Sequence, residues 1–214
     1  MRSRWFGLVV AAVAAALSVW AYPRLPAVVA IHWGPSGQPN GYASRGFAVA
    51  LLPLVMLGIT LLFQVLPKLD PRAQNYAKFT AAYWVIGNAV VVFLLAVHGF
   101  VIAYGLGYHA NIGRLMPQAF GILFIVLGNY LSRVEPNWFV GIRTPWTLSS
   151  DTVWRETHRT GGFVFMLGGL VMIAESSLPA ARATVALAVT IPVVVLVPIV
   201  QSYVLWRREQ RGGP

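Results

Sequence analysis

Residues 129–159 read NYLSRVEPNWFVGIRTPWTLSSDTVWRETHR and form the polar part of a chain that is otherwise strongly apolar. The chain has 16 basic and 6 acidic residues, and seven of these charged residues lie in this segment. Long apolar runs flank the segment on both sides. Over all 214 residues, 57% are hydrophobic and only 10% are charged, whereas about a quarter of a soluble domain is charged. The composition therefore predicts a polytopic membrane protein whose specific chemistry is concentrated in one connection.

An α-helix needs about 20 mostly apolar residues to cross a bilayer. The first apolar stretch also fits a cleaved signal peptide, because Arg2 and Arg4 precede it. Its apolar run is long, however, and Tyr22-Pro23-Arg24 follows in place of a clear small-residue cleavage site, so we expect a retained helix. Six stretches meet the length requirement and predict an all-α bundle of six transmembrane helices: Trp5–Tyr22, Phe47–Leu66, Thr80–Tyr104, Leu115–Leu131, Gly161–Leu178 and Ala183–Trp206.

Basic residues are divided unevenly between the connections of these helices. Twelve of the 16 Lys and Arg residues lie in the N-terminus, the 67–79 connection, the 129–159 segment and the C-terminal tail. Because cytoplasmic connections are enriched in Lys and Arg, we expect both termini and the 129–159 segment in the cytoplasm. This topology accounts for the net charge of +10, and no basic block exceeds Arg207-Arg208, so direct nucleic-acid binding is not expected.

Glycines repeat at seven-residue intervals in the fourth and fifth predicted spans. Gly121 and Gly128 form one pair, and the adjacent glycines at 161–162 repeat at 168–169. Residues seven apart share a helix face, and small residues let helices approach closely in lipid. The two spans that flank the 129–159 segment are therefore expected to pack tightly.

The 129–159 segment contains several turn and helix signals. Pro136-Asn137 favours a turn, Gly141 gives backbone freedom, and Thr144-Pro145 interrupts a helix. Ser149 or Ser150 is a candidate N-cap for a short amphipathic helix. This helix is expected to continue into the fifth span.

Two interpretations of the segment remain open. A helix that begins near residue 150 places Trp154 and His158 on one face and Arg155 and Arg159 on another, which is typical of an interfacial anchor. The residues before the helix, including Arg143, carry more hydrogen-bond donors than a membrane anchor needs. These donors favour a docking surface for a cytoplasmic partner. The residues assigned to this surface are Asn129, Tyr130, Asn137, Phe139, Gly141, Arg143, Thr144, Pro145, Trp146, Thr147, Ser149, Trp154, Thr157, His158 and Arg159.

The connection at 23–46 is rich in proline and glycine and is expected on the outer side. AVVAIHW at 27–33 is a candidate extended piece, and Ser36-Gly37 and Asn40-Gly41 are candidate tight turns. Such a loop is typical of a recognition site and equally of a structured connector. The residues assigned to recognition are His32, Trp33, Gly37, Pro39, Asn40 and Gly41.

A resemblance to a known family rests on these two segments. The run GNYLSRVEPNWFVGIRTPWTLSSDTVWRETHRTGG, from Gly128 to Gly162, resembles the signature of the SdpI immunity-protein family of bacterial membrane proteins. IHWGPSGQPNG, at 31–41, is similar to the N-terminal module of that family. We therefore divide the chain into a two-span module, 1–66, and a four-span module, 67–214, within one compact membrane domain.

The resemblance implies a multi-pass protein of the bacterial plasma membrane that gives immunity to a secreted toxic peptide. The best-known family member also acts as a receptor that holds a transcriptional repressor at the membrane. The partners implied are therefore a toxin peptide outside, a repressor in the cytoplasm and the surrounding lipid bilayer.

A small-molecule or proton-linked transporter is the main alternative. Asn88, His98 and Glu175 are polar residues within apolar spans, and such residues are functional candidates by default. His98 and Glu175 could form a proton-linked pair near the outer side. The favoured interpretation is that Asn88 joins neighbouring helices and that His98 bonds a neighbouring carbonyl.

An enzyme is the least favoured class. His32, His98, His109 and Glu175 could gather around a metal, but the chain has no HExxH motif and no two histidines share a helical face. The absence of cysteine excludes disulfides and thiolate metal sites. We expect no enzyme activity, no cofactor and no metal, and the sequence leaves the oligomeric state open.

Overall fold

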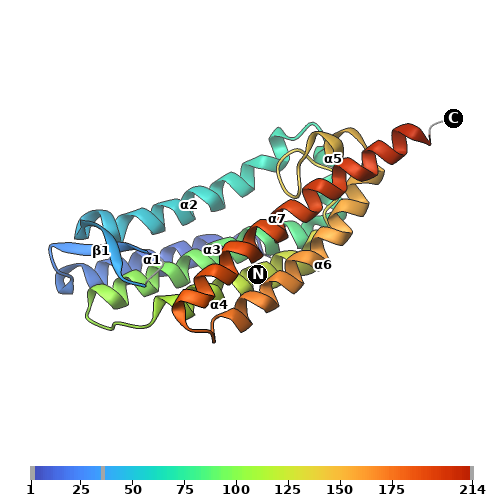
Figure 1. The fold of residues 1–214 in the computed structure, drawn as a ribbon. Helices are drawn as coiled ribbons and strands as arrows, with labels where there is room; N and C mark the ends of the chain where they lie inside the picture. Colours follow the sequence, from blue (N-terminus) through green and yellow to red (C-terminus); the bar gives the residue numbers. More distant parts are fainter. Residues whose placement is uncertain (1–2, 35–36, 213–214) are drawn as a thin grey trace.

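The computed structural model describes residues 3–34 and 37–212, apart from the side chains of residues 180, 181 and 184. Arg2 and the Ser36 half of a predicted turn lie outside the described residues. The chain forms long helices, a two-stranded hairpin and short turns (Figure 1). In chain order the elements are α1 Phe6–Ala21, η1 Tyr22–Arg24, β1 Val28–Trp33, β2 Pro39–Ser44, α2 Arg45–Leu69, η2 Ala73–Asn75, α3 Tyr76–Gly105, α4 Ile112–Leu131, α5 Pro145–Ser149, α6 Asp151–Glu175 and α7 Ala180–Arg211.

The long helices form two groups of three that run side by side (Figure 1). Helices α1, α2 and α3 pack on one another as the amino-terminal group, and α4, α6 and α7 form the carboxy-terminal group. Contacts between α3 and α4 join the groups. The hairpin covers one end of the bundle, called the hairpin end below, and α5 lies at the other, the α5 end.

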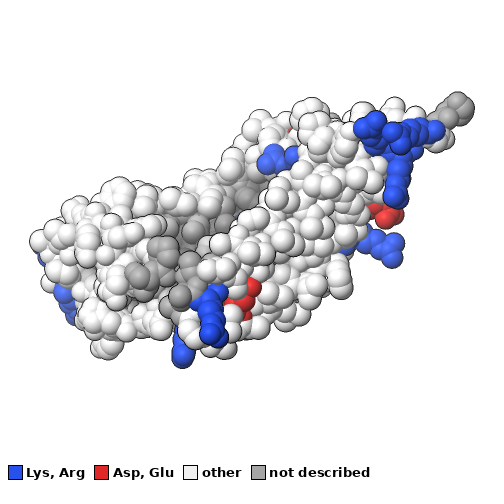
Figure 2. Space-filling model, viewed as in Figure 1, with Lys and Arg blue, Asp and Glu red and all other residues white. Residues whose placement is uncertain are grey.

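Among the residues that the structure describes, five helical segments are long and apolar enough to cross a membrane, and each overlaps one of the six predicted spans: Phe6–Arg24, Arg45–Leu69, Ala73–Gly105, Ile112–Leu131 and Val185–Arg211. The predicted amphipathic helix and the predicted fifth span form one continuous helix, α6, of 25 residues. Helix α6 is not among these five segments, and its first turns carry charged side chains. Figure 2 shows charged side chains gathered toward the two ends of the face in view, with uncharged surface between them.

Glycine contacts explain why α6 lies between α4 and α7. A Cβ atom added to Gly128 would lie 2.5 Å from the carbonyl oxygen of Gly162. One added to Gly121 would lie 2.5 Å from the carbonyl oxygen of Gly169. Gly168, on the neighbouring face of α6, lies against α7 in the same close manner. The tight packing predicted from the seven-residue spacing is therefore confirmed for α4 and α6.

The hairpin corrects the prediction of an all-α fold. Strand β1 is the extended piece predicted at 27–33, and it pairs with β2 in antiparallel register. The turn predicted at Asn40-Gly41 is wrong, because both residues lie in β2 and Gly41 pairs with His32. A Cβ atom on Gly41 would lie 2.9 Å from the Cβ of His32, so the glycine serves close strand pairing. The actual turn is closed by the N–H of Gly34, which donates to the carbonyl of Gln38 at 2.9 Å.

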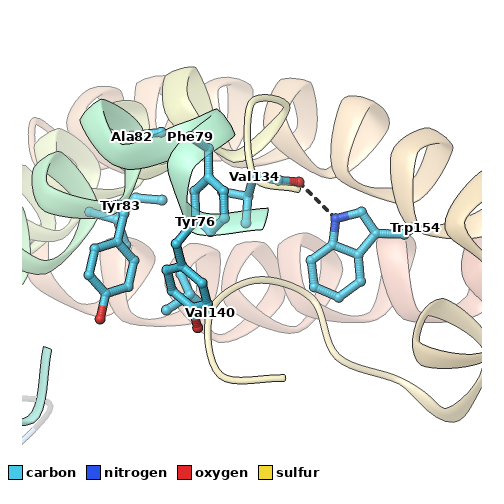
Figure 3. Close-up of a cluster of buried hydrophobic side chains, with 8 residues drawn as sticks. Tyr76, Phe79, Ala82, Tyr83, Val134, Val140 and Trp154 are labelled. Atoms are coloured by element: carbon cyan, nitrogen blue, oxygen red, sulfur yellow. Dashed lines mark hydrogen bonds between the residues drawn. The ribbon is translucent and has the colours of Figure 1, made fainter. Parts of the chain in front are cut away.

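Apolar side chains of both groups meet at the α5 end (Figure 3). Residues 76–86 of α3 supply one side of this contact, and residues 134–154 supply the other. The 129–159 segment is therefore folded onto α3. The buried members, called the α5-end cluster below, are Tyr76, Phe79, Ala82, Tyr83, Ile86, Val134, Val140 and Trp154.

Candidate functional site

The signature segment, residues 129–159, is folded by side chains that the sequence singled out. Asn137 is 1% exposed, and its Oδ1 accepts hydrogen bonds from the N–H groups of Phe139 at 2.9 Å and Val140 at 2.7 Å. Its Nδ2 donates to the carbonyl oxygens of Glu135 at 2.9 Å and Val140 at 2.8 Å. One buried amide therefore closes this turn, as Asn side chains commonly do by bonding to nearby backbone.

His158 holds the next part of the segment. The N–H of Ile142 donates to Nε2 at 2.9 Å, so Nδ1 carries the proton and donates to the carbonyl of Trp154 at 2.8 Å. Burial lowers the pKa of His158 to about 4, against a smaller raising effect of the Trp154 carbonyl. The ring is therefore neutral at pH 7. Gly141 beside it has a φ of +122°, and a Cβ there would collide with Nε2.

Trp154 is fully buried in the α5-end cluster, where its Nε1–H donates to the carbonyl of Val134 at 2.7 Å (Figure 3). Its indole stacks on the His158 imidazole with ring centroids 4.1 Å apart. The interfacial-anchor interpretation is therefore wrong for these two rings. The predicted N-cap is Ser150, whose hydroxyl accepts from the N–H of Val153 at 3.2 Å. The helix that starts there turns the Trp154 face toward α3.

Thr144 and Thr147 build α5, a short helix that the sequence interpretation missed. The hydroxyl of Thr144 accepts from the N–H of Thr147 at 3.1 Å, and the hydroxyl of Thr147 accepts from the N–H of Thr144 at 2.9 Å. This is a reciprocal capping box, and Pro145 follows at the position where its missing N–H costs nothing. The Thr144 hydroxyl also lies 3.0 Å from that of Ser202 on α7. The cap thus joins the segment to the last helix.

Part of the signature segment is exposed. Arg143 is exposed, and its Nη1 donates to the carbonyl of Trp138 at 2.9 Å. The Trp138 side chain is half exposed beside it. Of the residues assigned to docking, those exposed are Asn129, Arg143, Pro145, Ser149 and Arg159, those partly exposed are Tyr130, Phe139, Gly141 and Trp146, and those buried are Asn137, Thr144, Thr147, Trp154, Thr157 and His158.

Asp70 is the main residue that the sequence interpretation missed. It is 5% exposed, and its carboxylate accepts from the N–H of Trp138 at 2.9 Å and from the hydroxyl of Tyr76 at 2.7 Å. Nearby, Arg72 forms an ion pair with Asp151 at 2.6 Å. The connection between α2 and α3 therefore holds the signature segment to the amino-terminal group. The available signal was an acidic residue directly after an apolar span in a chain with only 6 acidic residues.

The hairpin end brings the predicted recognition residues into one structure. Nδ1 of His32 lies 2.5 Å from Oδ1 of Asn40 across the hairpin. Trp33 pairs with Pro39 in the strand register. The Trp33 ring packs edge-on against two aromatic rings of α3, with centroids 4.9 and 5.1 Å away. Gly37 lies in the connecting turn with a φ of +77°.

The three predicted intramembrane polar residues lie apart. Asn88 donates to the backbone just before α1 at 3.0 Å. Nε2 of His98 lies 2.9 Å from the hydroxyl of Ser18 on α1, and Glu175 accepts from the hydroxyl of Thr190 on α7 at 2.6 Å. His98 therefore joins helices of the amino-terminal group and Glu175 joins helices of the carboxy-terminal group. The structure does not bring the two together as a proton-linked pair.

The histidines considered as metal ligands have separate surroundings. His32 contacts Asn40, and His109 packs edge-on against Tyr104 with ring centroids 4.5 Å apart. Within residues 3–34 and 37–212, no three His, Asp or Glu side chains are placed to hold a metal ion.

Comparisons with known proteins match both the amino-terminal and the carboxy-terminal parts of the sequence. Residues 133–202 match the model of the SdpI/YfhL protein family, and residues 9–57 match a domain of unknown function, DUF1648. The chain is 26% identical over 176 residues to the immunity protein SdpI of Bacillus subtilis (strain 168), which covers 82% of each chain. No solved structure matches the chain significantly. The family resemblance carried by the signature segment is thereby confirmed: residues 133–202 are similar to the SdpI/YfhL protein family.

Proposed function

We propose that this chain is a bacterial membrane immunity protein that gives resistance to a secreted toxic peptide. The observation that carries the proposal is the family match of residues 133–202, which takes in most of the signature segment and its supports in α6 and α7. The similarity to an immunity protein over 82% of the chain supports it. Binding and resistance, rather than catalysis, are the proposed activity.

The proposed topology has six spans with both termini and the α5 end in the cytoplasm. Helices α4 and α7 are candidate spans, and α6 packs along α4 through the Gly121–Gly169 and Gly128–Gly162 contacts. A helix that lies along two spanning helices crosses the same depth, so α6 is the proposed sixth span. The excess of Lys and Arg in the connections of the α5 end supports the orientation. The division into modules 1–66 and 67–214 belongs to the same proposal.

The exposed surface around Arg143 and Trp138 is the proposed docking surface for a cytoplasmic regulator, such as a transcriptional repressor. Arg and Trp are enriched among the residues that dominate binding at protein interfaces. The backbone beneath them is held by the buried side chains of Asn137 and His158. A surface held in one shape loses little conformational entropy when a partner binds.

The substitution Arg143→Ala tests this function. In Bacillus subtilis cells that lack SdpI, the wild-type chain is expected to restore growth in the presence of the toxin. The variant is expected to reach the membrane at the same level and to lose protection or regulator recruitment, because the exposed guanidinium is removed while the buried supports stay in place. Growth and membrane abundance are measured together.

Arg155→Ala is the matched control, since Arg155 is exposed on α6 and lies in the same segment. It is expected to behave as wild type. Equal protection by Arg143→Ala at equal expression contradicts the docking role. If both variants lose protection equally, net charge rather than a defined surface determines partner binding.

The transporter alternative receives no specific support from the geometry. His98 and Glu175 are bonded within different helix groups. We therefore carry immunity forward as the single proposed function.

A further inference from the structure

A groove of about 590 Å³ runs along one face of α7, and the residues that line it all belong to that helix. It extends from Pro192 to Arg208. Apart from Gln201, the wall between these ends is apolar, and it includes the exposed side chains of Leu196 and Val200. Helix α7 contains a candidate span. If α7 crosses the bilayer, this exposed face lies against lipid rather than water.

The length of the groove matches the depth of one leaflet of a bilayer. The helix between Pro192 and Arg208 is about 24 Å long, since each residue adds about 1.5 Å. One leaflet with its headgroup region is about 20–22 Å deep. The rings of Tyr203 and Trp206 stack near the Arg208 end, with centroids 6.4 Å apart, and such rings favour the headgroup level. The apolar wall therefore lies at the depth of acyl chains, and Arg208 lies at the depth of phosphate groups.

Arg208 is the basic residue that lines the groove, and it is exposed. Its two neighbours in the sequence are engaged elsewhere. Arg207 donates to a tyrosine hydroxyl one turn earlier at 2.8 Å, and Glu209 accepts from the hydroxyl of Ser150 at 2.9 Å. Among the described residues, no ion pair includes Arg208. Figure 2 shows basic side chains gathered at this end of α7, and such clusters beside a membrane span attract anionic lipids.

We propose that the groove binds an anionic phospholipid of the leaflet at the α5 end, with an acyl chain along Leu196 and Val200 and the phosphate on Arg208. A phospholipid joins a hydrocarbon chain to a phosphate, and the groove offers an apolar wall and an unpaired guanidinium at the corresponding depths. A headgroup with a net negative charge is favoured, because a zwitterionic one brings a cation beside the arginines. The site is independent of the proposed immunity function, since it requires only that α7 crosses the bilayer.

Two pairs of substitutions test the site. Arg208→Gln removes the cation of the groove, and Arg155→Gln is the matched control because it removes the same charge from an exposed position on α6. Leu196→Trp fills part of the apolar wall, and Val195→Trp is its control because Val195 is exposed on α7 but does not line the groove. Native mass spectrometry of the full-length protein measures binding of phosphatidylglycerol and of phosphatidylcholine with the same acyl chains.

The wild-type protein is expected to bind phosphatidylglycerol about tenfold more tightly than phosphatidylcholine. Arg208→Gln is expected to weaken the binding of phosphatidylglycerol about fivefold, the usual effect of one basic residue near an anionic lipid surface. It leaves phosphatidylcholine binding nearly unchanged. Leu196→Trp is expected to weaken the binding of both lipids, because an acyl chain of either lies on the same wall. Both control variants are expected to bind as wild type.

Four results overturn the proposal. Equal affinity of the wild-type protein for the two lipids removes the preference for an anionic headgroup. Equal loss in Arg208→Gln and Arg155→Gln assigns that preference to net charge. Competition by glycerol phosphate at the concentration of the lipid indicates a site for a free phosphate group. A wild-type dimer that Leu196→Trp dissociates, with lipid binding unchanged, indicates that the groove is a contact between two copies of the chain.

Discussion

At the scale of single residues, we expect His158 to make the fold of the signature segment depend on pH. Its pKa is lowered to about 4 in the folded protein, against about 6.5 in an unfolded chain. Between these values the unfolded state binds a proton that the folded state does not, so the free energy of unfolding falls as the pH falls. The contribution is complete well above pH 6.5 and decreases by up to about 1.4 kcal/mol per pH unit between pH 6.5 and about 4. Protonation of Nε2 also removes the acceptor for the Ile142 N–H.

Hydrogen exchange of the backbone amides at 137–144 checks this prediction. Their protection is expected to be high at pH 7.5 and clearly lower at pH 5, after correction for the intrinsic exchange rate. His158→Gln is the control, because it removes the titrating group. Its protection is expected to be lower at pH 7.5 but to change little down to pH 5. Equal protection of the wild type at both pH values would rule out His158 as the sensitive group.

Residue types in the signature segment could be predicted, but their partners could not. Asn137 bonds to backbone two and three residues away, so the local sequence determines this turn. Trp154 donates to a carbonyl 20 residues away, and Asp70 accepts from an amide 68 residues away. Such partners depend on how α3 packs against the segment. For this reason, Asn137, Trp154 and His158, which were expected at a docking surface, are buried within the folded segment.

At the scale of helices, the α4–α6 contact depends on glycine. A Cβ atom at Gly128 would meet backbone atoms of Gly162 and Met166 at 2.5 and 2.8 Å, and backbone cannot move aside as a flexible side chain can. Gly128→Ala is expected to lower the stability of the protein by about 1–3 kcal/mol, the usual cost of overpacking. Gly58→Ala in α2 is the control, because nothing lies within 4 Å of the added Cβ. It is expected to be neutral or to stabilise by up to about 1 kcal/mol, since Ala is the better helix former.

Thermal unfolding in detergent micelles measures both variants. If the unfolding midpoint temperature of Gly128→Ala equals that of Gly58→Ala, the close α4–α6 contact does not contribute to the stability of the protein.

The positions of the long helices were predictable because apolar length alone defines a candidate span. The predicted Trp5–Tyr22 and Leu115–Leu131 stretches differ from α1 and α4 by three residues or fewer at each end. The hairpin was only half predicted. Strand β1 carries the β-branched run of AVVAIHW, whereas β2 reads PNGYAS and has little strand propensity of its own. Its pairing with β1 decides its structure, and that pairing is a tertiary effect.

At the scale of the whole molecule, the two helix groups meet at two distant places. One is the hairpin end, where residues of both groups line a cavity of about 570 Å³. The other is the α5 end, where Asp70 and Arg72 bond to the signature segment. A ligand acts at a distance only if it binds one arrangement of the groups better than another. A ligand that contacts both groups would therefore bias their relative position.

The proposed topology requires six spans. Because the chain has no cysteine, single introduced thiols can test this requirement. Tyr108, Ser132 and Gln210 are exposed in the α3–α4 connection, at the end of α4 and near the end of α7. If α6 crosses the bilayer, Ser132→Cys and Gln210→Cys lie on the cytoplasmic side and Tyr108→Cys lies outside. A membrane-impermeant maleimide is then expected to label Tyr108→Cys in intact cells and the other two variants only after permeabilisation. If α6 lies along the surface instead, α7 alone separates Ser132 from Gln210, and the two thiols would react from opposite sides.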